Sequence, residues 1–183
     1  MKPPLYILAG GKSSRFGSDK ARVERDGLPL IVGIAQSLES ATSDVTVVAA
    51  AAGAYSDLGL RTLGDIEVGK GPMGGLATAM DDLTESHDGD WLLLAACDLV
   101  DVDPRWVDLL TEHVVGVRAV AFRGADGWEP VFALYHTDLR TEIADRLEGG
   151  RRSLQALLDA VETAAVEKPS GFRQVNRPAD IGS

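Results

Sequence analysis

The sequence predicts an α/β fold with a mainly parallel β-sheet. Short apolar segments, several of them rich in β-branched residues, alternate along the chain with longer segments of helical character. This alternation is expected for parallel strands joined by crossover helices. The 183 residues, 45% apolar and 25% charged, have the balance of an ordinary globular protein, and this length suits one domain. Since no repeat, low-complexity tract or linker divides the chain, we expect residues 1–183 to form a single domain.

Four elements are expected in the first third of the chain. Residues 5–9 form an apolar run that predicts the first strand, and this run leads directly into a glycine-rich loop. Residues 29–39 predict a helix with a proline in its first turn, where a missing N–H group is tolerated. Residues 45–50 are apolar and β-branched, which is typical of a buried strand, and residues 60–63 predict a short strand that ends near Asp65.

The rest of the chain continues the same alternation. A glycine-rich turn precedes a helix expected at residues 74–84, and residues 91–96 predict a buried strand that ends at Cys97 and Asp98. The next helix is expected at residues 104–113. The remaining elements are expected to be strands at 117–122 and 131–135, helices at 137–147 and 153–160, a strand at 164–167 and a turn at 177–181.

The charge and the cysteine content exclude several classes of protein. The net charge is −10, and a uniformly acidic surface repels nucleic acid and anionic membranes. Cys97 is the single cysteine, so no intramolecular disulfide forms and nothing indicates an oxidising compartment. The longest apolar stretch is far shorter than the roughly 20 residues that span a bilayer. We expect a cytoplasmic protein, a monomer or weak homo-oligomer, without a nucleic-acid or membrane partner.

A basic, glycine-containing segment follows the first predicted strand. Gly10 and Gly11 lack Cβ atoms, so their backbone N–H groups can approach phosphate oxygens closely. Lys12, Arg15 and Lys20 have the charge to neutralise a polyphosphate. The spacing fits neither a Walker A loop nor a dinucleotide fingerprint, and a purely structural strand-to-helix turn is the alternative. On an acidic chain, a basic cluster around glycines favours a small anionic ligand.

Three features lie where predicted strands end: the loop from Gly10, then Asp65 and Asp98. In open α/β sheets, ligands bind beyond the carboxyl ends of the strands, so these features are expected to meet in one site. A carboxylate at the end of an apolar strand is costly unless it is paired or bound to a metal, and Mg²⁺ prefers one or two carboxylates together with substrate phosphates. Asp98 is therefore a candidate Mg²⁺ ligand, whereas for Asp65 a turn aspartate is an equal alternative.

Several segments together resemble one known family. The segment LAGGKSSRFGSDKA, at residues 8–21, resembles the signature loop of the MobA-like nucleotidyltransferases, whose pattern is roughly LAGGxSxRMGxDK. The resemblance extends along nearly the whole chain. The other matching segments are GPMGG at 71–75, ACD at 96–98, EPVFAL at 129–134, RR at 151–152 and VNRPAD at 175–180.

The resemblance implies a three-layer, Rossmann-like nucleotidyltransferase fold and suggests roles for particular residues. On this basis the candidate catalytic residues are Lys20, Arg15 and Asp98, and Asp98 is also the candidate Mg²⁺ ligand. The candidate acceptor-binding residues are Arg151, Arg152 and Asn176. The residues expected to bind the nucleotide are Leu8, Ala9, Gly10, Gly11, Lys12, Lys20, Asp65, Gly75 and Asp98.

Within this family, the resemblance is closest to the guanylyltransferases of molybdenum cofactor synthesis. It implies an Mg²⁺-dependent enzyme that uses GTP, takes molybdopterin or a similar phosphorylated acceptor, and supplies a molybdoenzyme or its chaperone. The chain departs from the family at Ala49, in place of an asparagine, and at Glu129, in place of a histidine.

Three alternatives stay open. Two are relatives with other substrates, a molybdopterin cytidylyltransferase and a cobamide-precursor guanylyltransferase. The third is a non-catalytic nucleotide-binding protein of the same fold, which the departures at Ala49 and Glu129 would permit. The start of the loop, LAGG rather than the LAAG of the cytidylyl enzymes, favours GTP over CTP.

Overall fold

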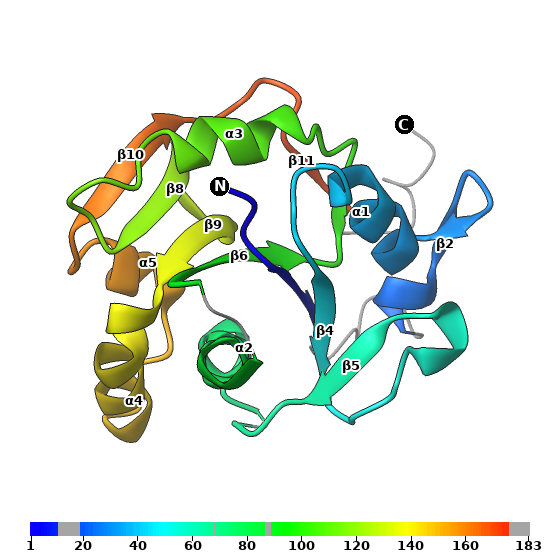
Figure 1. The fold of residues 1–183 in the computed structure, drawn as a ribbon, viewed down its shortest axis with the longest axis horizontal. Coiled ribbons are helices and arrows are strands. Elements are labelled where there is room, and N and C mark those ends of the chain that lie inside the picture. Colours follow the sequence, from blue (N-terminus) through cyan, green and yellow to red (C-terminus); the bar gives the residue numbers. More distant parts are fainter. Residues whose placement is uncertain (11–18, 68, 87–88, 176–183) are drawn as a thin grey trace.

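The protein is built around one seven-stranded sheet, shown in a computed structural model that describes residues 1–10, 19–67, 69–86 and 89–175 (Figure 1). The strands lie in the order β10-β8-β9-β6-β1-β4-β5. Only β9 runs antiparallel to its two neighbours, and the other neighbouring strands are parallel. Their bounds are β1 Leu5–Ala9, β4 Val45–Ala49, β5 Arg61–Gly64, β6 Trp91–Ala96, β8 Ala119–Gly124, β9 Gly127–His136 and β10 Thr163–Glu167. The mainly parallel sheet that the sequence predicts is confirmed.

Helices cover both faces of this sheet and make three layers, as Figure 1 shows. Side chains of α1 and α3 pack in one core cluster, and side chains of α2, α4 and α5 pack in a second cluster on the other face. The α-helices are α1 Leu30–Leu38, α2 Pro72–Ser86, α3 Arg105–Thr111, α4 Arg140–Glu148 and α5 Leu154–Leu158. The 3₁₀ turns are η1 Lys20–Arg22, η2 Ser56–Leu58 and η3 Thr137–Leu139.

The central strand β1 explains why its sequence is apolar without interruption. Successive side chains of a strand point to opposite faces, and here Leu5 and Ile7 belong to the cluster under α1 and α3, whereas Tyr6 belongs to the cluster on the α2 side. All three are fully buried. A parallel strand covered on both faces therefore needs an apolar side chain at each position.

Two small antiparallel pairs, which the sequence analysis did not predict, are added to the main sheet. Strands β2 (Glu24–Arg25) and β3 (Leu28–Pro29) form a hairpin. Its turn residues Asp26 and Gly27 both have positive φ, 53° and 78°, the backbone that an Asp-Gly pair favours in a two-residue hairpin. The second pair joins β7 (Leu99–Val100) to β11 (Arg173–Gln174).

The boundaries of several elements differ from those expected. Pro29 does not lie in the first turn of α1, because its ψ of 137° is extended and it ends β3 instead. The strand expected at 131–135 begins earlier, at Gly127, because Gly127 and Trp128 also pair with β8. The helix expected at 137–147 opens with the 3₁₀ turn η3. The turn expected at 177–181 lies outside the described residues. No helix in the described ranges is long and apolar enough to cross a membrane.

Candidate functional site

The candidate site lies at the edge of the sheet where four neighbouring parallel strands end. Strands β5, β4, β1 and β6 are adjacent and run in one direction, so Asp65, Gly10 and Asp98 come to the same edge. Backbone hydrogen bonds hold these ends together: the Asp65 N–H group donates to the Ala49 carbonyl at 2.6 Å, and that of Cys97 donates to the Leu8 carbonyl at 3.1 Å. The convergence expected from the topology is present.

The carboxylate of Asp98 has one oxygen in an ion pair and one oxygen without a partner. Its Oδ2 accepts a hydrogen bond from the Lys20 Nζ at 2.8 Å, and the two side chains are only 21% and 16% exposed. Its Oδ1 is buried and has no hydrogen-bond partner among the described residues. An unpartnered buried carboxylate oxygen is costly, so this atom is suited to a ligand that arrives with positive charge.

These features fit a bound Mg²⁺ ion. Mg²⁺ takes oxygen ligands and in substrate complexes needs only one or two carboxylates, since phosphates and water complete its coordination. The buried, unpartnered Oδ1 of Asp98 provides one such oxygen. Across the described ranges, no group of three or more His, Cys, Asp or Glu side chains could hold a metal without a substrate. The described residues thus offer a partial metal site, which oxygen ligands from a bound phosphate would have to complete.

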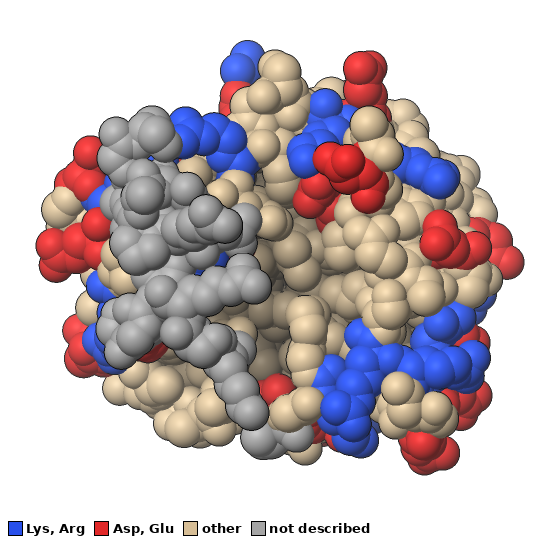
Figure 2. All heavy atoms as spheres, turned by 180° about the vertical axis from the view of Figure 1, so that it is seen from behind, with Lys and Arg blue, Asp and Glu red and all other residues tan. Residues whose placement is uncertain are grey.

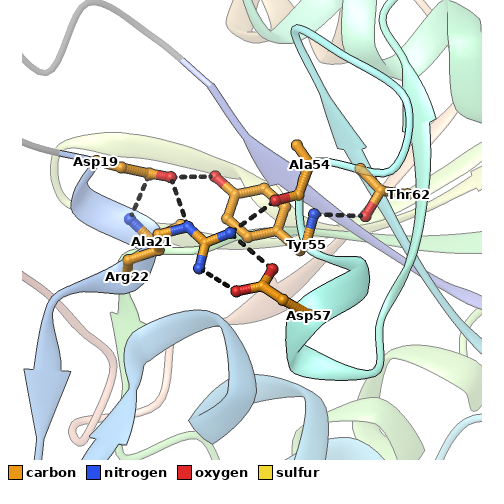
Figure 3. Close-up of polar contacts among 7 residues, drawn as sticks. All are labelled: Asp19, Ala21, Arg22, Ala54, Tyr55, Asp57 and Thr62. Atoms are coloured by element: carbon orange, nitrogen blue, oxygen red, sulfur yellow. Dashed lines mark hydrogen bonds and ion pairs between the residues drawn. The ribbon is translucent and has the colours of Figure 1, made fainter.

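Lys20 reaches Asp98 because it begins the 3₁₀ turn η1, which is tied to the segment between β4 and β5 (Figure 3). Asp19 caps this turn: its Oδ1 accepts from the Ala21 N–H group at 3.1 Å, and its Oδ2 accepts from the Tyr55 hydroxyl at 2.8 Å. Arg22 donates to both carboxylate oxygens of Asp57 at 2.8 Å. Sequence reasoning assigned no role to Tyr55, because nothing near it in the sequence marks a contact with the glycine loop.

Asp65 is held in the turn that leads from β5 to α2. Its Oδ1 accepts hydrogen bonds from the Glu67 N–H group at 2.9 Å and from the Thr78 hydroxyl at 3.1 Å. Thr78 is buried in α2 and also accepts from the Ile66 N–H group at 3.1 Å. These bonds fix Asp65 at the site edge and give it the structural role that was its alternative, while its role toward a nucleotide stays a prediction.

Gly75 lets the first turn of α2 lie against β1. A Cβ atom at this position would meet Leu8 Cδ2 at 2.6 Å, which is closer than real Cβ contacts allow. At the preceding Gly74, a Cβ atom would meet the Glu67 carbonyl oxygen at 2.7 Å. Both glycines are buried. Packing therefore favours glycine at both positions, and the start of α2 comes close to the end of β1.

The predicted acceptor residues are only partly described. Arg151 and Arg152 are exposed just before α5, and Arg152 donates to the Gly69 carbonyl at 3.2 Å, which links the pair to the turn before α2. Asn176 lies outside the described residues, as do Gly11, Lys12 and Arg15. The residue before Asn176 is placed, however: the Val175 N–H group donates to the Asp98 carbonyl at 2.9 Å.

The face drawn in Figure 2 is hollowed near its centre, and Lys and Arg side chains gather beside the hollow on an otherwise mixed surface.

Glu129 lies at the start of β9, which runs antiparallel to β6, so it too lies toward the edge where β6 ends. Its Oε1 is paired with Lys168 Nζ at 2.5 Å, and its side chain is 17% exposed. Lys168 therefore neutralises the Glu129 carboxylate.

Cys97 and Trp128 are packing residues. Cys97 is 9% exposed, and burial, aided by the nearby Asp98 charge, raises the pKa of its thiol to about 12. A thiol with so high a pKa is a poor nucleophile near neutral pH. Trp128 is 7% exposed, and its indole N–H group donates to Asp159 at 2.8 Å. Burial and these surroundings give both side chains a packing role.

Comparison with known proteins supports a shared family and fold. A family model described as the MobA-like NTP transferase domain matches residues 5–165. A probable molybdenum cofactor guanylyltransferase of Deinococcus radiodurans is 36% identical, with 96% of this chain and 90% of that protein covered. A molybdenum cofactor guanylyltransferase of Yersinia pestis is 31% identical, with coverages of 98% and 94%. The crystal structure of molybdopterin-guanine dinucleotide biosynthesis protein A from Archaeoglobus fulgidus superposes with a TM-score of 0.79 at 20% identity, covering 97% of this chain and 94% of that one.

Proposed function

This chain belongs to the MobA-like NTP transferase family, and from that membership we propose that it transfers GMP from GTP to the phosphate of molybdopterin, releasing pyrophosphate. The product would be the guanine dinucleotide form of the cofactor. The observation that carries the proposal is the pair formed by Lys20 and Asp98, in which one carboxylate oxygen is bound by the ammonium and the other is buried and unpartnered. That arrangement suits a cation and a polyphosphate bound side by side.

The acceptor itself supplies the nucleophile in this reaction. A phosphate monoester is largely dianionic near pH 7, because its second pKa is about 6, so its attack on the α-phosphorus needs no strong general base. A new P–O bond forms as the bond between the α-phosphorus and the bridging oxygen breaks, and the electron pair leaves with pyrophosphate. Catalysis then rests on alignment and on neutralising charge.

The residues of this chain divide those tasks. Lys20, held 2.8 Å from Asp98, would neutralise charge on the α-phosphate and on the leaving pyrophosphate. The Oδ1 atom of Asp98 would hold Mg²⁺, which when bound supplies Lewis-acid stabilisation of the phosphate oxygens. Arg151 and Arg152 would attract the anionic acceptor from the side of the turn at Gly69. Arg15, Lys12 and Asn176 keep the roles that the family resemblance gives them.

The choice of GTP rests on the start of the loop and on the names of the relatives. Leu8, Ala9, Gly10 and Gly11 give the LAGG start, and the relatives at 36% and 31% identity are named as guanylyltransferases. A cytidylyltransferase, a cobamide-precursor guanylyltransferase and a non-catalytic nucleotide-binding protein are the competing functions. The retention of Lys12, Arg15, Lys20 and Asp98 argues against the last.

The deciding measurement is pyrophosphate release with GTP, CTP, ATP and UTP in turn, in the presence of Mg²⁺ and molybdopterin. Release with GTP alone is expected. Release with CTP alone would move the chain to the cytidylyl branch. If no nucleotide gives pyrophosphate but calorimetry shows that GTP binds, the acceptor is wrong or the protein is not catalytic, and a panel of phosphorylated acceptors separates the two.

A further inference from the structure

The turn that carries Lys20 is fixed by contacts from a different part of the chain. Tyr55 lies between β4 and β5, far in sequence from the glycine loop, and its side chain is buried with only 4% of the residue exposed. Its hydroxyl donates to Asp19 Oδ2 at 2.8 Å. Burial, together with this hydrogen bond, raises the pKa of the Tyr55 phenol above its usual value, so the phenol stays protonated and stays a donor at neutral pH.

Asp19 could otherwise compete for the ammonium of its neighbour. A carboxylate next to a lysine in sequence can form an ion pair with it, but both oxygens of Asp19 are already engaged by Ala21 and Tyr55. Arg22 Nε lies 3.6 Å from the same carboxylate. Lys20 instead directs its ammonium to Asp98. The hydrogen bonds around Asp19 thereby bear on which carboxylate Lys20 meets.

The same turn is anchored a second time by Arg22. Its guanidinium makes a bidentate pair with Asp57 and also donates to the Ala54 carbonyl at 2.7 Å, while lying over the Tyr55 ring at 5.1 Å. Figure 3 shows the Tyr55 hydroxyl directed at the Asp19 carboxylate, with the Arg22 guanidinium lying against the ring. Since a bidentate pair fixes orientation as well as distance, η1 is held to the β4–β5 connection at two points.

We propose that Asp19 and Tyr55 are positioning residues for Lys20: their hydrogen bond holds η1 so that the Lys20 ammonium meets Asp98 at the ends of the strands. The proposal rests on the function proposed above, because it assigns these residues to the charge-neutralising step. Neither residue touches the reacting atoms. Their effect is on the placement of Lys20, which by preorganisation affects the transition state more than the binding of the nucleotide.

The first test compares two variants that each lose one tyrosine hydroxyl group. Tyr55→Phe removes only the hydroxyl that donates to Asp19, and we expect kcat to fall about tenfold while KM for GTP changes less than about twofold. Tyr6→Phe is the matched control, because that buried hydroxyl also donates to an aspartate, Asp82, at 2.8 Å, but from within β1. The control is expected to keep kcat. Equal losses in the two variants would overturn the proposal.

A double-mutant cycle separates positioning from a general loss of stability. If Tyr55 acts through Lys20, the Tyr55→Phe change is expected to have no further effect on kcat in a Lys20→Ala background. An additive loss would show that Tyr55 acts independently of Lys20 and would overturn the proposal. Should Tyr55→Phe fail to fold, Asp19→Asn takes its place, since an asparagine has the same shape and still caps the turn.

A readout without turnover keeps this inference separate from the proposed function. Acetylation of Lys20 by acetic anhydride, followed by mass spectrometry, is expected to be at least about threefold faster in Tyr55→Phe than in the parent protein, because η1 is then held less firmly and the ammonium is less firmly fixed on Asp98. Lys168, paired with Glu129, serves as the internal reference. An unchanged rate overturns the positioning role. Absence of pyrophosphate release in the parent protein, with faster Lys20 acetylation in the variant, would count against the proposed function alone.

Discussion

Two aspartates close together in the sequence show how the surroundings of a carboxylate determine what it can do. Asp98 is 21% exposed, and one of its oxygens has no partner among the described residues. Asp101 is 47% exposed, and Arg25 donates to both of its oxygens, at 2.8 and 3.1 Å, while Arg173 lies 3.5 Å away. The first carboxylate can therefore accept a cation at no cost to existing bonds, whereas the second would have to give up two guanidinium contacts.

We predict that Asp98→Asn lowers kcat for pyrophosphate release by about 100-fold or more, because the neutral amide binds Mg²⁺ weakly and no longer attracts Lys20. Asp101→Asn is the control, and its φ of 56° is a left-handed value that asparagine tolerates. That variant is expected to stay within about threefold of the parent protein. Assays over a range of Mg²⁺ concentrations would measure both. Full Mg²⁺-dependent turnover in Asp98→Asn would contradict the assignment of the metal to Asp98.

At the scale of elements, the sequence was most informative where the local pattern alone determines the structure. The strands at Leu5–Ala9 and Trp91–Ala96 begin and end where their apolar runs do, because each is covered on both faces. The start of β9 was missed because Gly127 joins the sheet through pairing with Gly124, which is a tertiary contact. The hairpin turn, in contrast, has a local signal in Asp26 and Gly27, since an Asp-Gly pair favours a two-residue turn.

The candidate site likewise has one part that the local sequence predicts and another part that it does not. Asp98 and Asp65 could be placed at one edge from strand ends alone, since topology brings the ends of parallel strands together. The pair of Lys20 with Asp98 depends on η1, and η1 depends on Tyr55 and Asp57, which belong to another connection. Such contacts between distant segments carry no local signal. A single sequence therefore indicates which residues reach the site better than it indicates what holds them there.

We predict that alanine is tolerated better at Gly75 than at Gly74, although both lie in the first turn of α2. At Gly75 the clash is with the end of a flexible side chain, Leu8 Cδ2, which can move; at Gly74 it is with the Glu67 backbone carbonyl, which cannot move without shifting the turn. Overpacking of this kind costs about 1–3 kcal/mol, and we expect Gly75→Ala near the lower end and Gly74→Ala at the upper end or beyond. Urea unfolding measures both.

A second substitution tests the cause of the Gly75 effect. If the clash with Leu8 is responsible, adding Leu8→Ala to Gly75→Ala should cost less than Leu8→Ala costs in the parent protein, because the new methyl group then occupies space that the shorter side chain leaves. Strictly additive losses would contradict the role of that contact. Since Leu8 is also a predicted nucleotide-binding residue, stability and not turnover is the appropriate measurement.

On the scale of the whole molecule, the distribution of charge is more informative than its total. The net charge is −10, yet many of the described basic side chains are committed to carboxylates. Arg22, Arg61 and Arg140, for example, pair with Asp57, Asp82 and Asp81. An anionic ligand approaching an acidic protein needs a local excess of positive charge. The exposed Arg151 and Arg152, described in the predicted acceptor region, supply such an excess.

The core on the α2 side contains two buried tyrosines that make the stability of the whole molecule fall with pH in the alkaline range. Tyr6 and Tyr135 are fully buried in this cluster, and their hydroxyls donate to Asp82 at 2.8 Å and to the Pro130 carbonyl at 2.7 Å. Burial raises the pKa of both phenols above their ordinary value, and the hydrogen bond to Asp82 raises that of Tyr6 further. In the unfolded chain both titrate near the ordinary value of about 10.

The folded state therefore keeps these protons at pH values where the unfolded state loses them. The stability that the raised pKa values provide is fully present below pH about 10 and is lost as the pH rises further, at about 1.4 kcal/mol per pH unit for each phenol. Above pH about 10 the unfolding free energy falls with pH. We predict that Tyr6→Phe makes this slope shallower by about 1.4 kcal/mol per pH unit, and that Tyr135→Phe does the same. Urea unfolding at several alkaline pH values measures the slopes. Parallel slopes for parent and variants would mean that the phenols ionise equally in both states, and that the core admits water to them.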